Sequence, residues 1–162
     1  MFWRELPGCE LNSLESSDIK TSQNIIKKFN IDQSLNDVTL CLKWLRETPQ
    51  CNGLVSTIGF GIGSNLSYLS GLWLDIESSV CYNFNDSKFF IENDTFIRRP
   101  MLLHLSYDTY KNIKIDKKEN FIEGVNNIDL NVYNDCDKNF YRIADKNYNE
   151  NDTAKANKLT LS

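Results

Sequence analysis

The spacing of apolar residues changes near residue 54, and this change constrains the fold more than any other feature of the sequence. Before it, Leu35, Val38, Leu42 and Leu45 recur with the period of an amphipathic helix. After it, short apolar or aromatic runs follow one another, separated by turn-forming residues, as in a series of strands. We therefore expect helices in the first third of the chain and strands in the middle third.

Two helices are predicted before the change, over residues 18–30 and 35–47. Ser17 is placed to cap the first, and Ser34 is placed to cap the second. Thr48 precedes a proline and is therefore expected to end the second helix, since the residue before proline is pushed out of the helical region. A third, shorter helix is predicted over 117–126, where an acidic start leads into apolar residues.

The runs between residues 54 and 107 predict an antiparallel sheet, because they are short and their breaks are typical of hairpins. Further strands are predicted over 128–132 and around 139–143. The expected fold class is α+β: an antiparallel β-sheet with helices packed on one face. We expect one domain over residues 1–145, followed by a mobile polar tail over 146–162.

Composition excludes some classes of partner. The net charge is −4, with 22 acidic residues against 18 basic ones. Nucleic-acid binders neutralise phosphates with clustered lysine and arginine, so nucleic acid is not an expected partner, whereas a basic protein surface is. The first residues lack the apolar core of a signal peptide, and no stretch is apolar enough to cross a bilayer. We expect a cytoplasmic protein, and the irregular spacing of its five cysteines predicts reduced thiols and no metal site.

A glycine motif follows the apolar run over 54–58. Gly59, Gly61 and Gly63 stand two residues apart. A dinucleotide-binding turn needs its third glycine one residue later, where this chain has Ser64, and needs a helix after it. The following segment has the pattern of a strand, so we expect the glycines to mark close backbone packing or a bulge, and we expect no cofactor.

The only histidine is His104, in the run MLLHLSY. Most zinc sites, serine and cysteine triads, and ribonuclease sites with two histidines therefore lack at least one usual component. Its neighbours Leu103 and Leu105 should point to the opposite face of a strand, and a hydrogen-bonded structural role is expected. The alternative is a small enzyme that uses His104 with a nearby acid. We expect no catalytic residue, and we expect the Arg98-Arg99 pair to form ion pairs with Glu92 and Asp94.

Two segments, GLWLDIE (71–77) and FIRRPMLLHLSYDTYKNIKI (96–115), together with the aromatic runs between them, carry a resemblance. They resemble immunity proteins of bacterial contact-dependent growth inhibition systems. The resemblance implies a small, acidic, non-catalytic protein of the cytoplasm that binds one cognate toxin domain, often a nuclease, and blocks its active site or its substrate. It implies no role for any individual residue.

An acidic docking surface is the corresponding expectation from the residues themselves. In a strand over 68–77, Trp73 would share one face with two carboxylates, and an indole flanked by acids can anchor a basic partner. More acids lie in the turns that follow. The predicted partner-binding residues are Trp73, Asp75, Glu77, Asp86, Glu92 and Asp94. The oligomeric state is left open.

Overall fold

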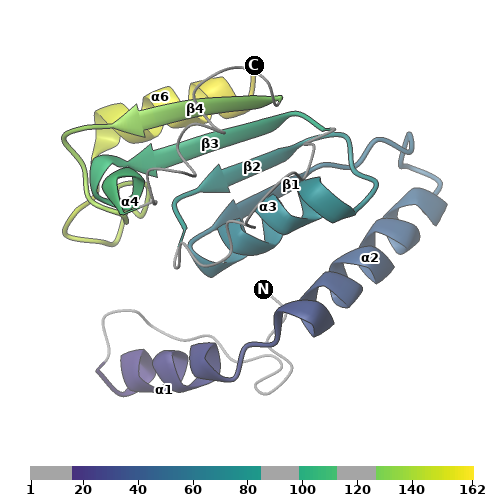
Figure 1. Ribbon diagram of the computed structural model, residues 1–162, viewed down its shortest axis with the longest axis horizontal. Helices are drawn as coiled ribbons and strands as arrows, with labels where there is room; N and C mark the ends of the chain where they lie inside the picture. Colours follow the sequence, from purple (N-terminus) through teal and green to yellow (C-terminus); the bar gives the residue numbers. More distant parts are fainter. Residues whose placement is uncertain (1–15, 85–98, 113–126) are drawn as a thin grey trace.

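The computed structural model describes residues 16–84, 99–112 and 127–162, and these form an α/β fold. Its sheet contains β1 (Thr57–Phe60), β2 (Ser79–Tyr82), β3 (Met101–Ser106) and β4 (Ile128–Tyr133), in that order and entirely parallel (Figure 1). The predicted antiparallel sheet is therefore wrong. Parallel neighbours cannot be joined by a tight hairpin, so each connection has to cross over the sheet.

The helices before the sheet lie where the sequence predicted them. α1 covers Ser16–Lys27 and α2 covers Ile31–Glu47. α2 begins earlier than expected, because the side chain of Asn30, not that of Ser34, accepts a hydrogen bond from the backbone of Gln33. The predicted strand at 128–132 is confirmed as β4, whereas residues 139–143 form turns. The predicted helix at 117–126 lies outside the described residues.

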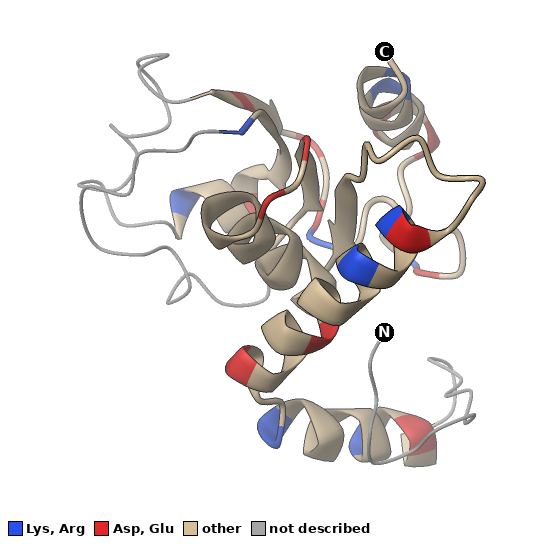
Figure 2. Cartoon of the chain, turned by 90° about the vertical axis from the view of Figure 1, so that its right-hand side faces the viewer, with Lys and Arg blue, Asp and Glu red and all other residues tan. Residues whose placement is uncertain are grey.

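The largest correction concerns α3 (Ile62–Trp73), which occupies much of the segment predicted to be a strand. Its small residues Ser64, Ser67 and Gly71 recur at helical spacing and are buried. A side chain at Gly71 would overlap the side chains of Met101 and Ser79, so these small residues let the helix lie close to the sheet. α3 carries no charged residue (Figure 2). Its sequence therefore lacks the charged stripe by which an amphipathic helix is normally recognised.

Helices cover both faces of the sheet, not one as predicted. On the face toward α3, Cys81, Leu103 and Leu105 are buried with Leu69 of that helix. The opposite face carries Tyr82, His104 and Tyr133, and there α6 (Glu150–Thr160) packs against it. Strands buried on both sides are typical of parallel sheets and explain the nearly continuous apolar run of β3. A short helix, α4 (Tyr107–Lys111), follows β3 directly.

The C-terminal segment differs from the polar tail that the sequence indicated. Asn149 caps α6 by accepting a hydrogen bond from the backbone of Asp152, and Ala156 is fully buried against the sheet. The hydroxyl of Tyr82 bonds to Asn157 and Thr160 at 3.0 and 2.8 Å. α6 therefore docks mainly through small and polar groups, which a hydrophobic pattern does not reveal.

Among the described helices, none is long and apolar enough to cross a membrane.

Candidate functional site

The junction of β1 and α3 is a sharp turn with a positive φ at its centre. β1 ends at Phe60, Gly61 follows with φ 56° and ψ −117°, and α3 begins at Ile62. A Cβ atom at Gly59 would overlap the carbonyl oxygen of Gly63, so strand and helix approach each other too closely for any side chain there. The close packing expected of these glycines is confirmed at Gly59, but the strand expected after them is a helix.

This junction has the form of a nucleophile elbow. In such elbows a G-x-S-x-G sequence makes a sharp strand-to-helix turn, and the central serine takes a strained conformation that exposes its hydroxyl. The backbone N–H of the next residue then helps to bind the oxyanion. Gly59, Gly61 and Gly63 have this spacing, and Gly61 stands at the position of the nucleophile. The turn is thus present with no side chain at its centre.

His104 lies inside the fold and away from any surface. It is in β3 with no exposed area, and its ring nitrogens lie 2.9 Å from the Tyr133 hydroxyl and 3.1 Å from the Thr160 hydroxyl. Burial lowers the pKa of His104 to about 4, so the imidazole is neutral near pH 7. Leu103 and Leu105 point to the opposite face, as predicted. These contacts support the structural role expected for His104.

The carboxyl ends of the later strands are tied together by Asn83. This residue has a positive φ of 49° just after β2. Its side chain accepts a hydrogen bond from the backbone of Ser106, the last residue of β3, and donates one to the backbone carbonyl of Lys138 after β4. A catalytic triad on a hydrolase-type sheet places its acid and its histidine in such later loops. Acids are available there, as Asp108 after β3 and Asp135 after β4, but the chain's single histidine is elsewhere.

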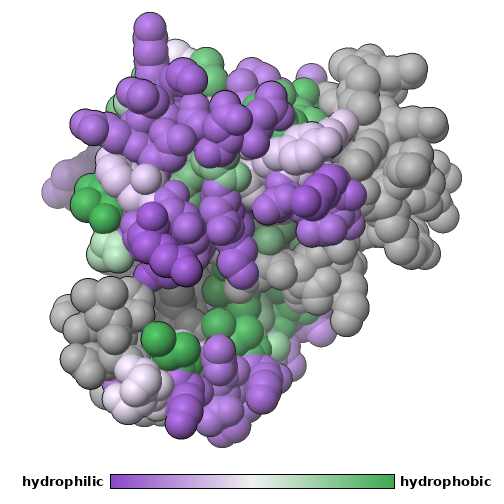
Figure 3. Space-filling view, turned by 90° about the vertical axis from the view of Figure 1, so that its left-hand side faces the viewer, coloured by the Kyte–Doolittle hydropathy of each residue, from purple (hydrophilic) through white to green (hydrophobic). Residues whose placement is uncertain are grey.

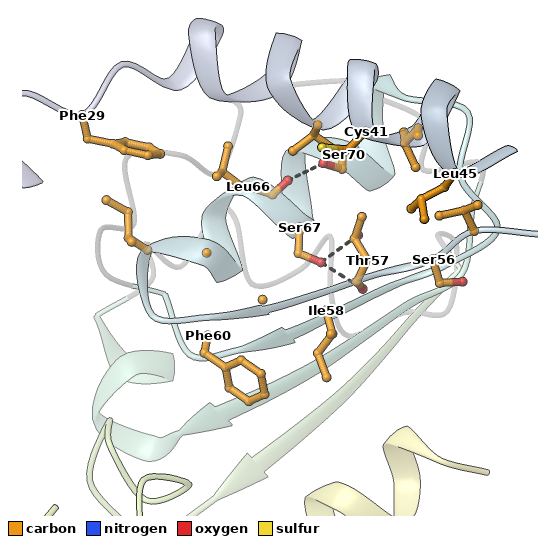
Figure 4. Close-up of a pocket in the computed structure, with 16 residues that line it drawn as sticks. Phe29, Cys41, Leu45, Ser56, Thr57, Ile58, Phe60, Leu66, Ser67 and Ser70 are labelled. Carbon is orange, nitrogen blue, oxygen red and sulfur yellow. Dashed lines mark hydrogen bonds between the residues drawn. The ribbon is translucent and has the colours of Figure 1, made fainter. Parts of the chain in front are cut away.

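A groove with a volume of about 450 Å³ lies beside the elbow, between α2 and β1 (Figure 4). All four residues of β1 line it, together with the first turns of α3. From α2, Cys41 and Leu45 reach toward it, whereas the side chains of Ile58 and Phe60 point away from α3. Among the described residues, the lining consists of Phe29, Val38, Cys41, Leu42, Leu45, Val55, Ser56, Thr57, Ile58, Gly59, Phe60, Ile62, Gly63, Leu66, Ser67 and Ser70. No lining residue is charged.

The groove was missed by the sequence analysis, because its residues come from segments assigned to separate elements. The spacing of Gly59, Gly61 and Gly63 was a usable signal for the elbow. Comparison with the dinucleotide-binding pattern alone does not reveal this elbow. Figure 3 shows exposed hydrophobic residues gathered in a recess between the lower part of the molecule, which contains α1, and the part above it.

The predicted acidic surface is only partly within the described structure. Trp73 ends α3 and is 53% exposed, whereas Asp75 and Glu77 lie in the loop that follows and not on a strand. Asp75 forms ion pairs with Arg99 at 2.6 Å and with Arg46 at 3.5 Å, and Glu77 lies 3.9 Å from Arg99. Both acids therefore already face cations of the same chain. Asp86, Glu92, Asp94 and Arg98 lie outside the described residues.

Metal-ligating groups do not gather anywhere in the described part of the chain. Its four cysteines, Cys41, Cys51, Cys81 and Cys136, are free thiols. Cys81 is completely buried, and burial raises its pKa to about 12. Such a thiol is protonated and inert at neutral pH, so it is no candidate nucleophile.

No protein-family model matches the chain. One curated protein is similar to part of it: carboxymethylenebutenolidase 1 of Cupriavidus pinatubonensis (strain JMP 134), with 25% identity over 68 residues. The match covers 42% of this chain and 29% of that enzyme, so the chain matches less than a third of its relative. Immunity proteins do not occur among these findings.

Proposed function

We propose that this protein is a binding protein built on a hydrolase-type elbow, and that it does not catalyse hydrolysis. The observation that carries the proposal is Gly61, which takes a turn conformation that would strain any residue with a side chain, and which offers no nucleophile. A triad acts as a unit, and loss of its nucleophile removes most of the catalytic acceleration. The partial similarity to a hydrolase agrees with a hydrolase-type fold in part of the chain and does not require that the activity is shared.

The environment of His104 adds support. A general base must lie within hydrogen-bond reach of the proton that it removes. His104 instead bonds to Tyr133 and Thr160 between β3, β4 and α6, with no exposed area. The alternative function, a small enzyme that uses His104 with a nearby acid, therefore has no accessible base.

The resemblance to immunity proteins predicts that the bound partner is a toxin. This stays a prediction and would be one specific form of the binding function. The ion pairs of Asp75 and Glu77 give no support to these two acids as its docking surface, because partner cations would have to displace Arg99 and Arg46.

The test is ester hydrolysis by the wild-type protein and by the Gly61→Ser variant. With p-nitrophenyl acetate as substrate, we expect neither protein to exceed the buffer rate, because Gly61→Ser restores a hydroxyl without supplying an accessible histidine. Gly63→Ser is the matched control, since it adds the same hydroxyl two residues after the elbow position, where a new Cβ would meet no atom. Saturable hydrolysis by the wild-type protein would show that the proposal is wrong.

A further inference from the structure

The free edge of β1 is the feature on which this inference rests. Val55, Thr57 and Gly61 direct their backbone groups to β2: Thr57 and Gly61 donate to Ser78 and Tyr82, and Val55 accepts from Glu77. Backbone groups alternate in direction along a strand, so those of Ile58 and Phe60 face the other edge. No described strand pairs with β1 on that side, and Ile58 and Phe60 are 53% and 46% exposed.

The groove runs along this same edge. Four successive residues, from Thr57 to Phe60, line it. The side chains of Ile58 and Phe60 point away from α3 (Figure 4), so these two residues border the cavity with their backbone, whose N–H and C=O groups face the free edge. α2 forms the opposite wall (Figure 4). An extended chain lying in this groove would therefore meet unpaired backbone groups on one side and apolar side chains on the other.

The edge also lacks the features that normally prevent strand addition. Natural proteins protect free edges with charged residues, prolines or bulges. Residues 54–63, LVSTIGFGIG, contain no charged residue and no proline. An unprotected edge beside an uncharged groove is suited to a partner.

We propose that the groove between α2 and β1 binds an extended, uncharged peptide segment of a partner protein, which adds to the sheet beside β1. The inference rests on the proposed binding function and names its site and the class of its ligand. In this mode of recognition, main-chain hydrogen bonds supply affinity and pockets for alternate side chains supply specificity. Because the lining carries no charge, a charged side chain in the groove would be buried without a counterion, which is costly. The inserted side chains are therefore apolar.

A second copy of this chain fits the groove less well. If β1 of another copy lay along the edge with its own α3 on the same face of the sheet, it would direct Thr57 and Gly59 toward the cavity, and glycine has no side chain. These small residues would leave most of the cavity of about 450 Å³ empty. A segment with larger apolar residues at every second position would fill it.

The experiment uses the full chain and a fluorescein-labelled peptide of alternating leucine and threonine, about eight residues long, with lysine at each end. Binding is followed by fluorescence anisotropy. Two further peptides carry backbone N-methyl groups, one at every leucine and the other at every threonine. Only alternate residues of an added strand bond to β1, so one methylated peptide should lose affinity by at least about tenfold and the other should bind like the parent.

The matched protein variants are Cys41→Trp and Leu40→Trp. Cys41 lines the groove, so the larger side chain should fill it and abolish binding. Leu40, its neighbour on α2, is 65% exposed and is not part of the lining, so Leu40→Trp should bind like the wild type. The methylated peptides test the proposal even if Cys41→Trp does not fold.

The proposal is overturned if the two methylated peptides lose affinity equally. It is also overturned if sodium decanoate binds and no peptide does, because the groove would then be a site for a small apolar ligand. Failure of all peptides to bind would also overturn it. None of these outcomes bears on ester hydrolysis. The peptide-binding proposal can therefore fail while the proposal of a non-catalytic elbow holds, and the elbow proposal can fail while the groove still binds peptide.

Discussion

The imidazole of His104 and the hydroxyl of Tyr133 join β3 to β4 through a hydrogen bond of 2.9 Å. They are diagonal neighbours, because His104 lies opposite Asn131 in the strand register. The other ring nitrogen lies 3.1 Å from the hydroxyl of Thr160, on α6. One residue thus holds two strands and the last helix together, and it can do so without charge, since a neutral imidazole both donates and accepts.

This arrangement predicts a pH-dependent stability. The pKa of His104 is about 4 in the folded protein, against 6.5 for an unperturbed histidine. Between these values the unfolded chain binds more protons than the folded one, so the free energy of unfolding falls as the pH falls. The loss is on the order of 3 kcal/mol between about pH 7 and about pH 4. Urea denaturation measured at both pH values provides the test.

The control for that measurement is His104→Gln, which keeps a donor and an acceptor but does not titrate. Carboxylates also contribute to acid sensitivity, and they are the same in both proteins. The wild type should therefore lose more stability on acidification than the variant does. An identical pH dependence of the two proteins would contradict the role assigned to His104.

A second prediction concerns the elbow glycines. Gly59→Ala should lower the free energy of unfolding by about 3 kcal/mol, because the new methyl group would overlap the backbone of Gly63. Gly63→Ala should raise it by about 0.5 kcal/mol, since its Cβ would meet no atom and alanine favours the helix. Thermal and urea denaturation of the two variants give the comparison. Similar effects of both substitutions would mean that the strand and the helix are not so closely packed.

The sequence predicted the local elements better than their arrangement. α1, α2 and β4 were predicted from the period of their apolar residues, whereas the predicted caps Ser17 and Ser34 lie inside α1 and α2. α3 was not found, since a helix in which Ser64, Ser67 and Gly71 face the sheet lacks a visible apolar stripe. Without a predicted helix between them, the apolar runs were separated only by short turns, as in hairpins, and an antiparallel sheet was therefore predicted.

The candidate site was less predictable than the fold. The role of Gly61 depends on its backbone angles, which the residue type permits but does not specify. The groove depends on how α2 lies relative to β1, a contact between segments that no local pattern describes. The structural role of His104 was expected from its place among the leucines of β3, but its partner Thr160 was not, because that residue belongs to the predicted tail.

A third prediction concerns the thiols. Cys81 has no exposed area and a pKa raised to about 12, so it should resist iodoacetamide in the folded protein and react in urea. Cys41 and Cys51 are partly exposed and should react in the native state. Peptide mapping by mass spectrometry gives the labelling at each position. Native labelling of Cys81 at the rate of Cys51 would show that the interior opens far more readily than its packing indicates.

The last prediction distinguishes a structural role of Asp75 from a docking role. Its side chain is 73% exposed, yet it bonds to Arg99 and Arg46, which come from distant parts of the chain. Asp75→Asn should lower the free energy of unfolding by about 0.5 kcal/mol at low salt and by less at high salt, because exposed ion pairs are weak and screened. Asp135→Asn is the control, since Asp135 is exposed and forms no ion pair with the described residues. Denaturation of both variants across a salt series should show a salt-dependent loss for Asp75→Asn alone. If the two variants behave alike, the arginines do not hold Asp75, and its carboxylate is free to meet a basic partner as the sequence first indicated.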